Sequence, residues 1–252
     1  MWQVNLSQSI VIHVPCDERG VVAAGDYEVA EVSGIGAPIR VEFLEPGAAP
    51  AVSVFPTGRA MDKLEFDSLL EIDASLVNAG NPTVFIDPAG LGLSGTGSVE
   101  TINADSGLLK KVKLIRCHAV VAMGLTDHLR AAGAQPGTPN LAWVDPACDY
   151  RATDGGEIVR NRMDISARIF SMGGFHHAFT GTKTGAVALA VAVSAKIPGI
   201  LVDRFLEHPC SDKGIRIGHA AAIMDADATV VQERRAWMCT KASLVRTART
   251  LM

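Results

Sequence analysis

One stretch of the chain, residues 164–201, combines features that few folds can accommodate. Residues 165–170 alternate apolar and polar side chains, which predicts a strand. A segment rich in glycine and threonine follows, and residues 186–195 are then almost entirely apolar until Pro198 and Gly199 end the run. A helix that is apolar all round must be enclosed by other structure. We therefore expect strands that surround one buried helix.

The segment that leads into this helix has two interpretations. The first N–H groups of a helix have no partner inside it, so residues 180–185 would offer an anion site. The same pattern fits a helix that only fills a core. A membrane span is not expected, because a bilayer requires about 20 apolar residues. A metal site at His176 and His177 is not expected either, because no further ligand stands at a suitable spacing.

Composition and charge restrict the class of protein. The chain of 252 residues is 48% hydrophobic, which allows a substantial core, and its net charge is −4. This charge provides no general attraction for nucleic acid or for a membrane surface. Five scattered cysteines without a CxxC pair predict reduced thiols in a cytoplasmic protein. Only Cys210, in a polar loop near His208, leaves open the alternative of a reactive thiol.

The periodicity predicts a mixed α/β chain in two parts. Residues 1–62 are expected to be mostly strands, and residues 63–252 to form a second domain around the buried helix. Strands are expected at residues 9–14, 21–24, 27–30, 39–43, 71–76, 141–144, 215–217 and 228–232. Helices are expected at residues 106–125, with a further turn or two at 127–134, and at the end of the chain at residues 242–252.

Two polar segments have less specific patterns. Residues 78–82 contain the turn formers Asn78, Gly80, Asn81 and Pro82 ahead of a buried strand. An asparagine amide there would also suit a carboxylate, so both interpretations stay open for Asn81. The glycine-rich residues 90–97 are expected to precede a polar stretch and no helix. Neither a P-loop nor a dinucleotide-binding fingerprint is therefore predicted.

Several short segments recur in the order and spacing of one known family. They are Pro56-Thr57-Gly58, residues 78–85, Ile115-Arg116, Met123-Gly124-Leu125, Thr138-Pro139, residues 164–168, residues 171–173, residues 176–178, residues 197–199 and residues 216–219. Together they resemble the PrpF family of methylaconitate, methylitaconate and oxalomesaconate isomerases, which is related in fold to diaminopimelate epimerase.

This resemblance implies a fold, an activity and a site. The implied fold has two domains, each a curved mixed sheet around a central helix. The implied activity is a cofactor-independent isomerisation of unsaturated di- or tricarboxylates by allylic proton transfer. His176 and Lys183 are candidates for moving or positioning the proton, and a structural hydrogen bond is the alternative for His176. The implied substrate-binding residues are Asn81, Arg168, Ser171, Met172, Gly173, Thr182, Thr184, Gly185, Gly218 and His219.

The chain also departs from the family pattern. Family members carry their proton-transfer lysine and cysteine in an N-terminal segment that has no counterpart here, so the first domain is expected to be incomplete. The family's Gly-His-Pro-Ser-Gly loop stands as Gly218-His219-Ala220-Ala221-Ala222. An inactive remnant or a polycarboxylate-binding protein is therefore the alternative function. Because the strands of residues 9–43 would leave unpaired edges, we expect a homo-oligomer.

Overall fold

The computed structural model describes residues 1–4, 8–29, 32, 34–46, 53–67, 70–94, 97–134, 137–178, 214–234 and 236–248. The expected central helix lies outside these ranges. So do the candidate site residues Thr182, Lys183, Thr184 and Gly185 and the candidate reactive thiol of Cys210.

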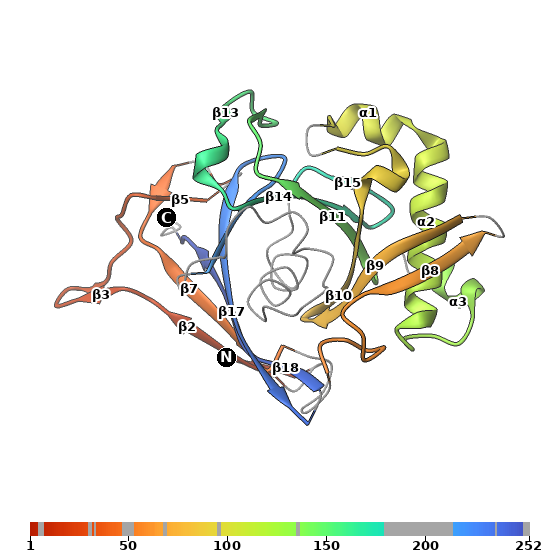
Figure 1. The fold of residues 1–252 in the computed structure, drawn as a ribbon. Coiled ribbons are helices and arrows are strands. Elements are labelled where there is room, and N and C mark those ends of the chain that lie inside the picture. Colours follow the sequence, from red (N-terminus) through yellow and green to blue (C-terminus); the bar gives the residue numbers. More distant parts are fainter. Residues whose placement is uncertain are drawn as a thin grey trace.

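Strands are the most frequent regular elements of the described chain (Figure 1). The strands are β1 (Trp2–Gln3), β2 (Gln8–His13), β3 (Cys16–Asp17), β4 (Gly20–Val21), β5 (Tyr27–Glu28), β6 (Ile35–Gly36), β7 (Ile39–Leu44), β8 (Asp62–Asp67), β9 (Leu70–Ala79), β10 (Asn81–Ile86), β11 (Asn140–Pro146), β12 (Tyr150–Arg151), β13 (Glu157–Ile158), β14 (Ile165–Ser171), β15 (Gly174–His176), β16 (Ile215–Gly218), β17 (Ile223–Glu233) and β18 (Ala236–Arg246). The helices are η1 (Pro88–Leu91), α1 (Val99–Ala104), α2 (Ser106–Ala122), α3 (Leu129–Gly133) and η2 (Arg160–Arg162).

One 12-stranded sheet organises these elements. Its order is β1-β2-β7-β18-β17-β16-β14-β11-β10-β9-β8, and β15 pairs with β14 beside this path. Two pairs, β10 with β11 and β14 with β16, are parallel, whereas the other pairs along the path are antiparallel. Figure 1 shows the sheet bending round, with α1, α2 and α3 on its outside. The mixed α/β fold predicted from the sequence is confirmed.

The sheet buries side chains on both of its faces. On the outer face, Trp143 and Leu76 share one core with residues of α1 and α2, such as Ile102 and Ile115. On the inner face, a second core runs from Phe85 on β10 across the sheet to Leu244 on β18. Because side chains alternate along a strand, these two cores assign every residue of the central strands to one face or the other.

The last expected helix, over residues 242–252, is wrong. Residues up to Arg246 belong to β18, and residues 249–252 lie outside the described part of the chain. β18 pairs with β17 on one side and β7 on the other, and it buries Ala242 and Leu244 in the inner core. Pairing on two sides outweighs the modest helix preference of alanine, leucine and arginine.

The expectation that no helix follows the glycine-rich segment is also wrong. Helix α1 begins directly after it, and the Ser98 hydroxyl accepts a hydrogen bond from the Thr101 N–H at 3.2 Å. Ser98 is a favourable N-cap, a signal that the sequence contained. The helix has only six residues, so its periodicity was too short to detect. Two expected strands near the N-terminus are shorter than predicted, at Gly20–Val21 and Tyr27–Glu28.

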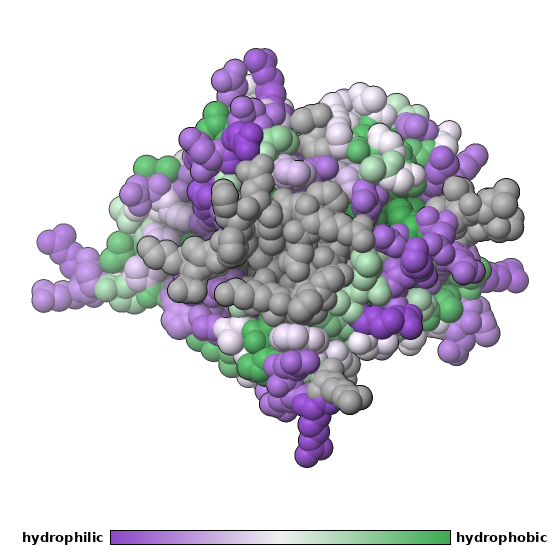
Figure 2. Space-filling model, viewed as in Figure 1, coloured by the Kyte–Doolittle hydropathy of each residue, from purple (hydrophilic) through white to green (hydrophobic). Residues whose placement is uncertain are grey.

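The N-terminal strands continue the same sheet. β7 pairs with both β2 and β18, while β2 meets only the two-residue β1 on its other side within the described residues. Val11 and Ile12 on β2 are exposed, and Figure 2 shows a hydrophilic tip on the adjoining β3–β4 arm. The boundary at residue 62 and the homo-oligomer both stay predictions. No helix in the described part of the chain is long and apolar enough to cross a membrane.

Candidate functional site

The hairpin between β14 and β15 contains the predicted Ser171-Met172-Gly173 segment. Ser171 pairs with Gly174, so Met172 and Gly173 form a two-residue loop. Both have positive φ angles, 53° and 90°, which is the pattern of a type I′ turn. Glycine adopts this conformation freely, whereas methionine does so at a cost in free energy. Met172 is also 73% exposed, so an apolar side chain on an unfavourable backbone conformation projects from this end of the sheet.

Strand β15 presents its two central side chains to opposite faces. Phe175 lies on the outer face, where its ring stacks with Trp143 at 5.4 Å and meets Phe170 at 5.6 Å. His176 pairs with Ile169, a residue of the inner core, so the histidine lies on the inner face. The packing of Phe175 therefore determines the side of the sheet on which His176 stands.

A row of polar residues crosses the inner face at the same end. Thr83 on β10 is the register partner of Asn140 on β11. The pairing of Leu141 with Phe170 places Asn140 opposite Ser171 on β14 by continuation of the register. All three lie on the inner face, because Val77, Ala142 and Ile169 of the inner core fix the alternation of their strands. Neighbouring strands lie about 4.8 Å apart, so Thr83, Asn140 and Ser171 form a row roughly 10 Å long.

Asn140 is the most unusual member of this polar row. It is 1% exposed, yet neither its amide nitrogen nor its amide oxygen has a hydrogen-bond partner within the part of the chain that the structure describes. A buried amide without hydrogen-bond partners lowers the free energy of unfolding by about 1 to 3 kcal/mol. Such a group in a folded protein calls for an explanation, and one explanation is a ligand. Asn81 lies two residues before Thr83 on the same face. The row thus combines hydroxyl and amide groups suited to a polar ligand.

Arg168 lies on the opposite side of the sheet from this row. Its register partner is Trp143 of the outer core, and its guanidinium carbon lies 4.7 Å from the centre of the Tyr150 ring. Nη1 donates to Ser166 Oγ at 3.1 Å and to the main-chain oxygens of Ala167 at 2.9 Å and Gly218 at 3.1 Å. Through these contacts Arg168 links β14 to Gly218 of β16 and to Tyr150 of β12.

Burial changes the titration of the groups around Arg168. It lowers the pKa of Arg168, although the Tyr150, Cys148 and Asp145 charges oppose that change. It raises the pKa of Tyr150 to about 12, against the effect of the nearby guanidinium. Burial also raises the pKa of the Cys148 thiol and of Asp145. The thiol and phenol are therefore neutral at physiological pH.

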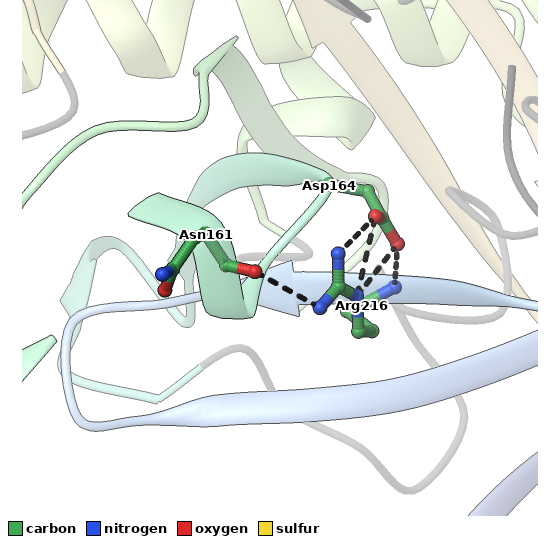
Figure 3. A network of polar contacts seen from close by, with 3 residues as sticks. All are labelled: Asn161, Asp164 and Arg216. Atoms are coloured by element: carbon green, nitrogen blue, oxygen red, sulfur yellow. Dashed lines mark hydrogen bonds and ion pairs between the residues drawn. The ribbon is translucent and has the colours of Figure 1, made fainter. Parts of the chain in front are cut away.

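Gly218 is required by packing on the outer face. A Cβ atom added there would lie 2.3 Å from Met163 Sδ and 3.2 Å from the Tyr150 hydroxyl oxygen. A nearby ion pair holds β16 to the start of β14, as Figure 3 shows. Arg216 donates from Nη2 to Asp164 Oδ1 and from its main-chain N–H to Asp164 Oδ2, each at 2.7 Å. Arg216 Nη1 also donates to the Asn161 carbonyl at 3.2 Å.

His219 is a buried histidine directly after β16. It is 3% exposed, and its main-chain oxygen accepts from the Tyr150 hydroxyl at 2.6 Å. The pKa of His219 is lowered to about 3, mainly by burial and to a smaller extent by electrostatic interaction with Arg168, Arg246, His177 and His176. His219 is therefore neutral at physiological pH. The loop after it, with Ala221 and Ala222, lines a separate cavity of about 490 Å³.

The low pKa of His219 makes stability depend on pH. The unfolded histidine has a pKa of about 6.5, so the unfolded chain binds a proton that the folded protein excludes. We expect the full contribution to stability above pH ~6.5 and a progressive loss, of up to about 4 kcal/mol, as the pH falls toward about 3. Urea unfolding at several pH values measures this. A His219→Gln variant should show a flatter profile than a His128→Gln control, and equal profiles would contradict the assignment.

The structure thus places the site residues predicted from the sequence on two different faces of the sheet. Asn81, Ser171 and His176 share the inner face at one end of the central strands, with Met172 and Gly173 in the adjoining turn. Arg168 and Gly218 lie on the outer face, and His219 follows β16. Thr83 and Asn140 are site residues that the sequence patterns did not single out. The signal for them was a polar residue directly before the apolar run of each strand, residues 84–86 in β10 and 141–144 in β11.

Comparisons with known proteins match the whole chain. The family model described as PrpF protein aligns with residues 1–252. The chain belongs to the PrpF family. It is 35% identical to 2-methyl-aconitate isomerase of Shewanella oneidensis over 255 residues, which cover 100% of this chain and 63% of the relative. It is 28% identical to 3-methylitaconate isomerase of Eubacterium barkeri, covering 98% of this chain and 63% of that protein.

A solved structure supports the same assignment. Methylitaconate-delta-isomerase superposes with a TM-score of 0.83 at 25% identity, over 99% of the PrpF-family chain and 62% of the solved one. The mixed α/β fold of this family, implied by the sequence resemblance, is confirmed, whereas the division into two domains stays a prediction. The chain therefore spans somewhat less than two thirds of the length of these relatives.

Proposed function

We propose that this PrpF-family protein is a cofactor-independent isomerase of unsaturated di- or tricarboxylates of the methylaconitate or methylitaconate type. The observation that carries the proposal is the inner-face row of Thr83, Asn140 and Ser171, with a buried Asn140 amide that has no hydrogen-bond partner among the described residues. The names of the relatives support this substrate class.

The polar row suits the binding of a substrate carboxylate. The amide nitrogen of Asn140 and the hydroxyl of Ser171 are donors, and a carboxylate is an acceptor with two oxygens. Hydrogen bonds to a charged group contribute about 1.5 to 3 kcal/mol each, more than those between neutral groups. An ionised substrate would also give the Asn140 amide a partner that the described residues do not supply. Asn81 stands beside the row as a further amide.

The proposed reaction moves one proton and changes no oxidation state. A base removes a proton from an allylic carbon, and the C–H electron pair enters the conjugated system to give a dienolate. The same proton or one from solvent then returns at the other end of that system. Donors at the carboxylate stabilise the charge that develops on oxygen. Such a base must stand within hydrogen-bonding reach of the C–H group.

His176 is the base that we propose among the described residues. Its Nδ1 lies 2.8 Å from the Ala178 carbonyl oxygen and 3.1 Å from the Ala178 nitrogen. The second contact is a hydrogen bond that the Ala178 N–H donates to Nδ1. Both contacts engage Nδ1, so Nε2 is the ring nitrogen that we propose exchanges the proton with the substrate. The His177 ring stacks on His176 at 4.5 Å and helps to fix its orientation. Lys183 stays a second candidate, outside the described residues.

Proton NMR in D₂O tests the proposed activity. We expect the protein to introduce deuterium at an allylic position of 2-methylaconitate faster than the buffer does, and a His176→Gln variant to lose at least about tenfold in rate. Tricarballylate, a saturated tricarboxylate, is the control substrate and should not exchange. Exchange no faster than in buffer, with 2-methylaconitate still bound, would contradict the isomerase and favour a polycarboxylate-binding protein.

A further inference from the structure

The edge of strand β15 that faces away from β14 is hydrogen-bonded to a side chain of helix α1. The Asn103 amide nitrogen donates to the Phe175 carbonyl oxygen at 3.0 Å, and the Phe175 N–H donates to Asn103 Oδ1 at 2.8 Å. One side chain therefore satisfies both main-chain groups of Phe175, as a neighbouring strand would. β15 has β14 as its strand partner within the described part of the sheet, so Asn103 supports its other side.

The surrounding residues are fitted to this contact. A Cβ atom added to Gly174 would lie 3.3 Å from Asn103 Oδ1, so glycine leaves the room that the amide occupies. The helix that carries Asn103 is itself fixed, since Ile102 is 6% exposed in the outer core and Ser98 caps the first turn. α1 is thus a rigid support for a strand of only three residues.

We propose that Asn103 is a positioning residue for His176 and Ser171. Phe175 directly precedes His176, and Gly174 is the register partner of Ser171, so the two hydrogen bonds fix the backbone between the proposed base and the polar row. The effect of Asn103 on binding and catalysis rests on the proposed function. Its effect on the position of β15 does not depend on that function.

Three variants distinguish the effect of the Asn103 hydrogen bonds from the effect of any change in helix α1. Asn103→Ala removes both bonds, and Asn103→Asp keeps an acceptor for the Phe175 N–H but no donor for its carbonyl. Glu100→Gln alters the same helix in its first turn and is the control. The readouts are hydrogen exchange of the Phe175 amide, the NMR signal of the His176 ring and the Kd for 2-methylaconitate.

For Asn103→Ala we expect Phe175 exchange to accelerate about tenfold, the His176 ring signal to shift and the Kd to rise about tenfold. Asn103→Asp should fall between this variant and the wild type, and Glu100→Gln should match the wild type. An unchanged His176 signal and Kd, despite faster Phe175 exchange, would overturn the proposal. If the wild type binds no 2-methylaconitate, the proposed function fails, and the His176 signal alone decides whether Asn103 positions the strand.

Discussion

Replacing Asn140 with leucine is expected to stabilise the protein and to weaken its binding of 2-methylaconitate. Leucine keeps the branched skeleton of the side chain but removes a buried amide that lacks partners among the described residues. We expect the free energy of unfolding to rise by about 1 kcal/mol, because the desolvation cost of the amide disappears. The Kd should increase roughly 10- to 100-fold through loss of a hydrogen bond to a charged group.

This pair of effects distinguishes a ligand-binding amide from a structural one. Urea unfolding and calorimetric titration with 2-methylaconitate measure the two quantities on the same sample. Asn161→Leu makes the same chemical change at an exposed position outside the polar row and should leave the Kd unchanged. An Asn140→Leu variant that is less stable, and that binds the acid as tightly as the wild type, would show that the amide serves the fold.

Replacing Phe175 with alanine is expected to cause the largest loss of stability among these variants. The ring is 4% exposed and packs against Trp143 and Phe170, and it anchors β15 on the outer face. Phenylalanine to alanine changes in a core cost about 3 to 5 kcal/mol. Binding of 2-methylaconitate should also weaken, because the placement of His176 depends on this strand.

Chemical unfolding tests the role of Phe175 directly. The exposed Val159→Ala variant is the control, and we expect it to stay within about 0.5 kcal/mol of the wild type. A loss below about 1 kcal/mol for Phe175→Ala would mean that the aromatic cluster does not hold β15, and the link between the outer core and His176 would then be wrong.

Local patterns were sufficient for much of the fold. Strands β2, β7, β11 and β14 and helix α2 lie close to their predicted positions, since each has a clear period of alternating or helical burial. The end of the chain was misread because Ala242 and Leu244 also suit a helix. Their burial as strand residues depends on β7, which lies about 200 positions earlier in the sequence.

The candidate site depended even more on pairing between distant segments. Asn81, Ser171 and His176 were found through the family resemblance, yet the sequence could not show that they share one face while Arg168 lies on the other. Asn140 follows Thr138-Pro139 and looks like part of a turn. Only the register of β10, β11 and β14 places it between Thr83 and Ser171.

The most direct test of the site is an NMR titration of isotope-labelled protein with 2-methylaconitate. If the polar row binds the carboxylate, the signals of Thr83, Asn140 and Ser171 should shift together and saturate with one Kd, and His176 should shift with them. The signals around Arg168 and Tyr150 on the outer face should move much less. Saturable shifts confined to the outer-face residues, with the row unchanged, would contradict the inner-face site.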